Sequence, residues 1–143
     1  MLGSTSGQST VATLQQISDF MVESFPQSKV SIEAVDAVSA TVRHRIGIEE
    51  LRPGGTVAGP VLMAVADAAL YVAIFGRLGI IPLAVTTSLT VNFLRKPASG
   101  QDIVGVCKLM KAGRSLAVGE VWLYSAGSDE PVAHAVGTYA LPR

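Results

Sequence analysis

The sequence predicts an α+β fold in which a strongly curved antiparallel sheet wraps around one long apolar helix. Residues 59–78 are apolar on nearly every face of the predicted helix, so other elements must enclose it. Four later runs, at 84–94, 102–110, 115–124 and 132–140, read as strands separated by turn residues. A curved sheet is the element available to enclose the helix.

The first part of the chain supplies two more elements. Helical spacing of apolar residues over 11–25 predicts a helix that Pro26 ends. Residues 29–46 read as a strand, and a Gly-rich approach leads to Gly59-Pro60, where proline suits the first turn of the long helix. The expected order is therefore helix, strand, long apolar helix, and four strands in a meander.

Length and composition limit the class of protein. With 143 residues we expect a single domain over residues 11–143, preceded by a frayed, Ser/Gly-rich segment over 1–10. Apolar residues make up 49% and charged residues only 15%, which leaves little polar surface for a small monomer and favours an oligomer. Eleven basic residues balance eleven acidic ones without a basic stripe, which argues against nucleic acid as the main ligand.

The single cysteine and the apolar run suggest where the protein works. Cys107 lies in a strand-like run with no metal-ligand spacing around it, so we expect a buried thiol and no metal site. The polar N-terminus lacks the features of a signal peptide, and Asp67 and Arg77 interrupt the apolar run, so a core helix is favoured over a membrane span. A cytoplasmic setting fits these features.

Asp67 is the anomaly of the long helix. A lone carboxylate among apolar neighbours is costly to bury unless a partner offsets the loss of hydration. One interpretation is that Asp67 faces solvent or pairs with Arg52 or Arg77. The other is a catalytic base or nucleophile in a partly dry site.

Gly59 is a second candidate, because a helix N-terminus presents free N–H donors suited to an oxyanion. The glycine alone also fits a simple turn into the helix. Gly59 and Asp67 are separated by roughly 12 Å along the helix at about 1.5 Å per residue. One helix therefore cannot bring both to one carbonyl, and a shared site would combine two subunits.

The segment RPGGTVAGPVLMAVADAA, residues 52–69, resembles the signature of hotdog-fold thioesterases of the phenylacetic-acid-degradation type. Gly55, Gly59 and Asp67 fall on matching positions, and the resemblance runs from about Val11 to the end of the chain. It implies a hotdog fold, hydrolysis of an acyl-CoA thioester without cofactor or metal, and a homodimer or a homotetramer built as a dimer of dimers.

The resemblance also implies roles for single residues. Asp67 matches the catalytic carboxylate, as nucleophile or general base, and Gly59 the N–H that polarises the thioester carbonyl. Thr86 falls near the family position whose hydroxyl orients the attacking water or the carboxylate. Thr87 is the alternative if the alignment is shifted by one residue. The chain departs from the pattern at three places, with Arg52 for Asn, Ala58 for His, and Pro60 for Gly.

Arg52 leaves two roles open, because its guanidinium suits both an ion pair with the partner's Asp67 and a CoA phosphate. The remaining basic residues lie at predicted turns and by default would simply face solvent. The resemblance implies a second role, because this family often binds CoA phosphates with such turns. The candidates for substrate binding are Arg52, Tyr71, Arg95, Lys96, Lys111, Gly113, Arg114 and Ser115.

The two histidines are expected to be structural or at the surface. His44 and His134 each lie on a predicted strand, away from the start of the long helix. Tyr71 is a core residue or part of an acyl pocket. The alternative to an enzyme is a non-catalytic protein that binds acyl-CoA or a small ligand, and a structural oligomer is a third possibility that leaves Asp67 unexplained.

Overall fold

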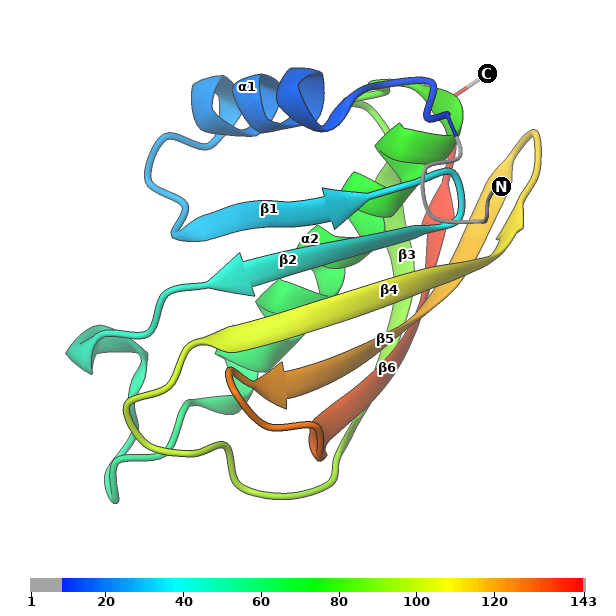
Figure 1. Cartoon of the computed structure of the whole chain (residues 1–143). Coiled ribbons are helices and arrows are strands. Elements are labelled where there is room, and N and C mark those ends of the chain that lie inside the picture. Colours follow the sequence, from blue (N-terminus) through cyan, green and yellow to red (C-terminus); the bar gives the residue numbers. More distant parts are fainter. Residues whose placement is uncertain (1–8, 143) are drawn as a thin grey trace.

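Six antiparallel strands form one sheet in the order β1-β2-β4-β5-β6-β3, and this sheet curves around the helix α2 (Figure 1). The computed structural model describes residues 9–142. The other helix, α1, runs alongside the edge strand β1 (Figure 1). The elements are α1 (Leu14–Ser24), β1 (Val30–Val35), β2 (Ser39–His44), a 3-10 turn η1 (Ile48–Glu50), α2 (Gly59–Leu78), β3 (Val85–Phe93), β4 (Ile103–Ala112), β5 (Leu116–Ser125) and β6 (Pro131–Ala140). This arrangement confirms the predicted hotdog fold.

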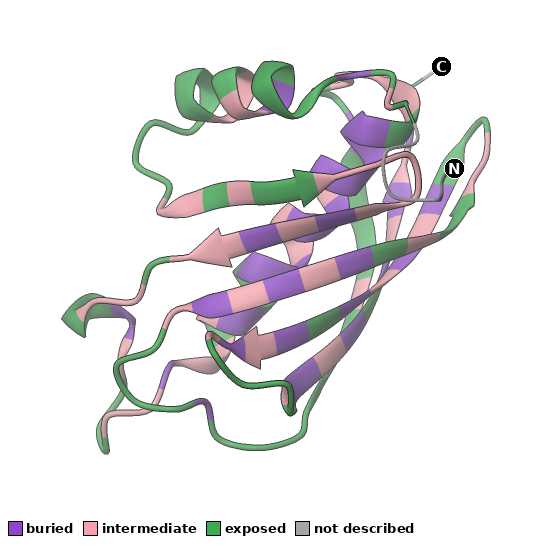
Figure 2. Ribbon diagram, viewed as in Figure 1, coloured by how far each residue is buried: buried purple, intermediate pink, exposed green. Residues whose placement is uncertain are grey.

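The helix α2 is the centre of the core. By length and composition alone it could cross a membrane. It instead packs against the concave face of the sheet, and ten of its twenty residues are buried. Small residues on that face allow a close approach, since a Cβ at Gly105 would lie 2.9 Å from Val65 Cγ1 and one at Gly119 would lie 2.8 Å from Leu70 Cδ2. Figure 2 shows buried positions alternating along β4, β5 and β6, as expected for strands with one face on the core.

The first helix is shorter than predicted. It begins at Leu14 because Thr13 is its N-cap and forms a capping box with Gln16. Val11 lies before this cap and donates its backbone N–H to the Gly76 carbonyl at the end of α2. Of the segment expected to be frayed, residues 1–8 lie outside the described residues.

The single strand predicted over residues 29–46 is wrong, because this run folds as the hairpin β1–β2. Asp36 makes the turn, and its Oδ1 accepts the backbone N–H groups of Val38 at 2.9 Å and Ser39 at 2.8 Å. Aspartate favours such turns because its short side chain replaces a backbone acceptor. The turn was missed because the residues on both sides of Asp36 have the composition of a continuous strand.

The predicted four-strand meander is also wrong in one connection. Strands β4, β5 and β6 form a meander, but β3 pairs with β6 instead of β4. The chain after β3 crosses the end of the sheet before it enters β4 (Figure 1). Turn signals locate strands without saying which ones pair, because the pairing depends on contacts distant in sequence. As a result β3 is an edge strand beside α2.

Candidate active site

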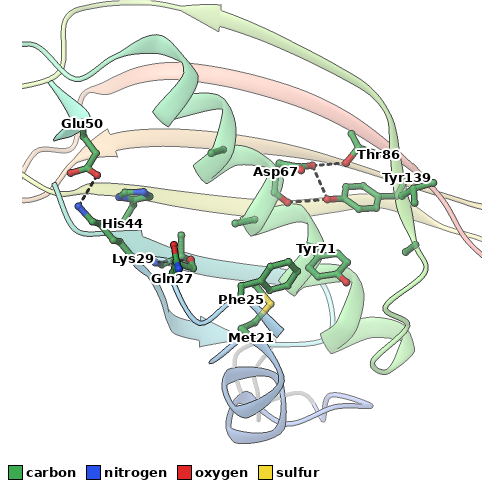
Figure 3. Close-up of a pocket in the computed structure, with 16 residues that line it drawn as sticks. Met21, Phe25, Gln27, Lys29, His44, Glu50, Asp67, Tyr71, Thr86 and Tyr139 are labelled. Atoms are coloured by element: carbon green, nitrogen blue, oxygen red, sulfur yellow. Dashed lines mark hydrogen bonds and ion pairs between the residues drawn. The ribbon is translucent and has the colours of Figure 1, made fainter. Parts of the chain in front are cut away.

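A cavity of about 740 Å³ opens along one face of α2 (Figure 3). Four residues of α2 line it at positions i, i+3, i+4 and i+7, which share one helical face. Ala64 and Ala68 are small and leave space on either side of Asp67. The lining residues are Met21, Phe25, Gln27, Ser28, Lys29, Val30, His44, Glu50, Ala64, Asp67, Ala68, Tyr71, Ala84, Val85, Thr86 and Tyr139.

Asp67 is half-buried in this cavity, and two hydroxyl groups bind it (Figure 3). Thr86 Oγ1 and Tyr139 Oη each donate to Asp67 Oδ1 at 2.7 Å. The Tyr139 hydroxyl also lies 3.2 Å from the backbone carbonyl oxygen of Asp67. Within residues 9–142, Asp67 forms no ion pair, so the expected alternative of a pair with Arg52 or Arg77 is not seen in this chain.

Strand register explains why Thr86 reaches Asp67 and Thr87 does not. Thr86 lies directly opposite Tyr139 on β6, and the register then shifts between Thr86 and Ser88. This irregularity leaves Thr87 without a partner in the β3–β6 register, and its hydroxyl donates to the Thr138 carbonyl at 3.3 Å. Bulges of this kind re-aim side chains beside active sites.

The tyrosines of the cavity remain protonated at neutral pH. Burial raises the pKa of Tyr139, and the neighbouring Asp67 carboxylate raises it further. Burial also raises the pKa of Tyr71, whose hydroxyl donates to the Pro82 carbonyl at 3.1 Å. Both phenols therefore act as hydrogen-bond donors.

The two ends of the cavity differ in chemistry (Figure 3). Met21 of α1 and Phe25, the C-cap of that helix, lie beside Tyr71 and form an apolar end, with the Phe25 and Tyr71 ring centroids 6.2 Å apart. At the other end the Lys29 ammonium pairs with Glu50 at 2.8 Å and with Glu49. The Lys29 ammonium holds the pKa of Glu50 below its ordinary value.

His44 lines the polar end of the cavity, although its sequence position predicted a structural or surface role. Its Nδ1 lies 2.7 Å from the Arg45 carbonyl oxygen. A carbonyl only accepts, so Nδ1 carries a proton, and in the neutral ring Nε2 is then an acceptor. The other histidine, His134, pairs with Glu120 at 2.9 Å and packs on Trp122, away from this cavity.

Gly59 lines a second cavity, of about 660 Å³, at the start of α2. Arg52, Arg95 and Lys96 line the same cavity, so three predicted substrate-binding residues and the predicted oxyanion donor lie together. Asp67 is not among them. One chain therefore does not bring Gly59 and Asp67 to the same cavity, as their spacing predicted.

The remaining predicted substrate-binding residues lie at the turn between β4 and β5, where Gly113 donates its N–H to the Leu116 carbonyl at 2.8 Å. This turn lies at the opposite end of the sheet from the loop that precedes α2 (Figure 1). Within one chain, Lys111, Arg114 and Ser115 are thus separated from the basic residues of the second cavity.

The described residues contain no cluster of three or more His, Cys, Asp or Glu side chains able to hold a metal. Cys107 is buried as predicted, and burial raises the pKa of its thiol to about 12.

Tyr139, His44 and Lys29 were not predicted as site residues. The sequence does contain a sign that Tyr139 has a special role. Side chains alternate along its strand, so Tyr139 lies on the same core face as Ala133, Ala135 and Gly137. A hydroxyl at the end of such an apolar row requires a polar partner. No comparable sequence signal marks Lys29 or His44.

This fold and site define a hotdog protein with a carboxylate site on its central helix. Residues 54–132 match the family model of the thioesterase superfamily. A candidate thioesterase from Silicibacter sp. TM1040 is 41% identical, with 96% of each chain covered and a TM-score of 0.87. The chain belongs to the thioesterase superfamily and is by class a thioester hydrolase.

More distant structures share the fold. Zebrafish thioesterase superfamily member 2 is 19% identical over 92% of this chain and 99% of its own, with a TM-score of 0.80. The Escherichia coli PaaI protein of the phenylacetic acid degradation operon is 20% identical over 89% of this chain and 92% of its own, with a TM-score of 0.71. No protein with a curated description matches the chain.

Proposed function

We propose that the protein hydrolyses acyl-CoA thioesters, with Asp67 as the catalytic carboxylate. The observation that carries this proposal is the half-buried Asp67 side chain, which lies in a large cavity and is oriented by two hydroxyl groups. A carboxylate that is both oriented and open to a cavity can take a proton from water or attack a carbonyl carbon.

The reaction follows one of two routes. As a base, Asp67 takes a proton from water while the water oxygen adds to the thioester carbonyl. As a nucleophile, Asp67 adds to that carbon and forms a mixed anhydride, which water then hydrolyses. In both routes the C–S bond breaks, CoA leaves as the thiolate and takes up a proton, and the free acid is released. Thr86 holds the carboxylate in place.

The oxyanion donor in this proposal is the Gly59 N–H of the partner subunit. As the first residue of α2, Gly59 has no acceptor for its N–H within the helix. Support for a dimer comes from β3, an edge strand with exposed apolar side chains at Val85 and Phe93, and from the exposed Leu83 beside it. A two-fold axis beside β3 would give two shared sites, and two such dimers would form a homotetramer.

CoA would bind through its phosphates. Arg52, Arg95 and Lys96 give the cavity at Gly59 a positive lining suited to phosphate. Lys111 and Arg114 would join them only from another subunit, because they lie at the opposite end of the sheet. Such a substrate fits a cytoplasmic enzyme that needs no cofactor or metal.

The test is release of free thiol from a panel of short-chain, long-chain and aryl acyl-CoA esters. We expect wild type to turn over at least one ester and Asp67→Asn to lose that activity. If wild type binds acyl-CoA by calorimetry but hydrolyses none of the panel, the proposal is wrong. The protein would then be the non-catalytic acyl-CoA-binding module that the replaced Asn and His positions also fit.

A further inference from the structure

The hydrogen bonds of the Asp67 carboxylate are unequal. Both hydroxyl donors bind Oδ1, and within residues 9–142 no hydrogen bond reaches Oδ2. We propose that Tyr139 is a positioning residue that holds Oδ1 together with Thr86, so that Oδ2 is the oxygen that reacts. This role rests on the proposed thioester hydrolysis by Asp67.

Tyr139 is suited to hold the carboxylate because its own position is rigid. Only 3% of its surface is exposed, and its ring stacks on Tyr71 with the centroids 6.1 Å apart. The hydroxyl lies 2.7 Å from Oδ1 and 3.2 Å from the Asp67 backbone carbonyl. Its proton is therefore shared between the side chain and the backbone of one residue, which ties the orientation of the carboxylate to the helix.

Thr86 alone would hold the carboxylate less firmly. Its strand β3 is an edge strand, and Thr86 is exposed, whereas Tyr139 lies on β6 between β3 and β5. Burial and the nearby carboxylate raise the pKa of Tyr139. Its hydroxyl therefore keeps its proton at neutral pH, where it donates a hydrogen bond and does not serve as a base. With both donors on Oδ1, the lone pairs of Oδ2 are left for the reaction.

The test compares Tyr139→Phe with Tyr124→Phe, a matched control that removes a hydroxyl outside the cavity. Tyr139→Phe should lower kcat by roughly 10- to 100-fold with KM nearly unchanged, as for a lost hydrogen bond to a charged group. Tyr124→Phe should match wild type in both kcat and KM.

A merely structural role for Tyr139 gives a different result. Loss of activity only in proportion to the loss of folded protein, with kcat per folded molecule unchanged, would overturn the proposal. A second measurement uses Thr86→Val and the double variant with Tyr139→Phe. Because either donor alone still holds Oδ1, the double variant should lose more than the product of the two single losses.

The outcomes separate this inference from the proposed function. If Asp67→Asn is inactive but Tyr139→Phe retains wild-type kcat, Asp67 remains catalytic and the role of Tyr139 is wrong. If wild type hydrolyses no acyl-CoA ester, the proposed function fails, and the positioning role is overturned with it.

Discussion

Thr86 and Tyr139 lie directly opposite each other on adjacent strands, and their hydroxyl groups donate to the same oxygen of Asp67. The pairing of β3 with β6 therefore builds the carboxylate site as well as the sheet. A change in the register of either strand would move a hydroxyl away from the helix, because side chains alternate between the faces of a sheet.

Asp67→Asn should abolish most of the activity without unfolding the protein. The amide nearly matches the carboxylate in size, but it cannot act as a base or nucleophile. We expect turnover to fall by about 10²-fold or more. Thiol release and thermal unfolding measure the two properties, and a folded variant within threefold of wild-type turnover would remove Asp67 from the mechanism.

Thr86→Val should lower kcat, whereas Thr86→Ser should retain most of it. Valine preserves the shape of threonine and removes its hydroxyl, while serine keeps the hydroxyl that donates to Asp67. The expected loss for valine is about 10-fold, the scale of one hydrogen bond to a charged group. Thr87→Val is the matched control, because the Thr87 hydroxyl donates to the Thr138 carbonyl. Equal losses at both positions would contradict the role of Thr86.

Mixing two inactive variants should restore activity if each site combines two subunits. Gly59→Val would crowd the oxyanion position, and Asp67→Asn removes the carboxylate. A Cβ at Gly59 would meet the Phe93 ring at 3.5 Å, an ordinary contact, so the first carbon of the new side chain fits. Random exchange makes half the dimers mixed, each with one intact site of two, so about a quarter of wild-type activity should return. Exchange confirmed by mass spectrometry with no activity would show that the site is not shared.

Lys111→Ala and Arg114→Ala should raise KM for acyl-CoA and leave kcat almost unchanged. Phosphate contacts bind the substrate and the transition state equally, so their loss weakens binding alone. The control substrate is the matching acyl-pantetheine, which lacks the nucleotide. Equal losses on both substrates would show that this turn does not bind CoA phosphates.

Acid should destabilise the protein partly through Asp102. The Ile46 backbone N–H and the Arg43 guanidinium, at 3.0 and 2.9 Å, hold the pKa of Asp102 below its ordinary value of 3.8. A lowered pKa stabilises the folded protein above the ordinary value, and this contribution is lost as pH falls through the folded pKa. Thermal unfolding should therefore show a falling Tm below about pH 4.

Asp102→Asn tests this origin of the acid sensitivity. The variant should have a lower Tm at pH 7 and a smaller further decline in acid. Asp129→Asn is the control, because Asp129 is exposed and accepts no hydrogen bond within residues 9–142. A parallel decline for wild type and Asp102→Asn would show that other carboxylates are responsible.

The long helix and the strand runs were predictable because each depends on a local pattern. The extent of α2 follows from continuous apolar residues with Pro60 at one end and Gly79 at the other. The hairpin at Asp36 and the pairing of β3 with β6 were not predictable in the same way. One short turn leaves little trace in a β-like run, and strand pairing depends on contacts distant in sequence.

The same distinction between local patterns and distant contacts separates the site residues that were predicted from those that were not. Asp67 could be predicted from the sequence because a charged carboxylate is unusual in an otherwise apolar helix. Tyr139 is 72 residues away and becomes a neighbour of Asp67 only when the sheet closes around α2. The preference for Thr86 over Thr87 depends on a register shift of one residue, which periodicity alone does not locate.

The register shift between Thr86 and Ser88 gives β3 one residue more than its pairing with β6 requires. In a regular strand, residues an odd number apart face opposite sides, yet Thr86 and Leu89 both face α2, opposite Tyr139 and Gly137. Removing Thr87 would leave Thr86 and Leu89 two residues apart, on the same face of a regular strand, with the same partners on β6. Deletion of Thr87 should therefore be accepted among active descendants of this chain, whereas a deletion between 89 and 93, where every residue is paired, would turn the following side chains to the other face of the sheet.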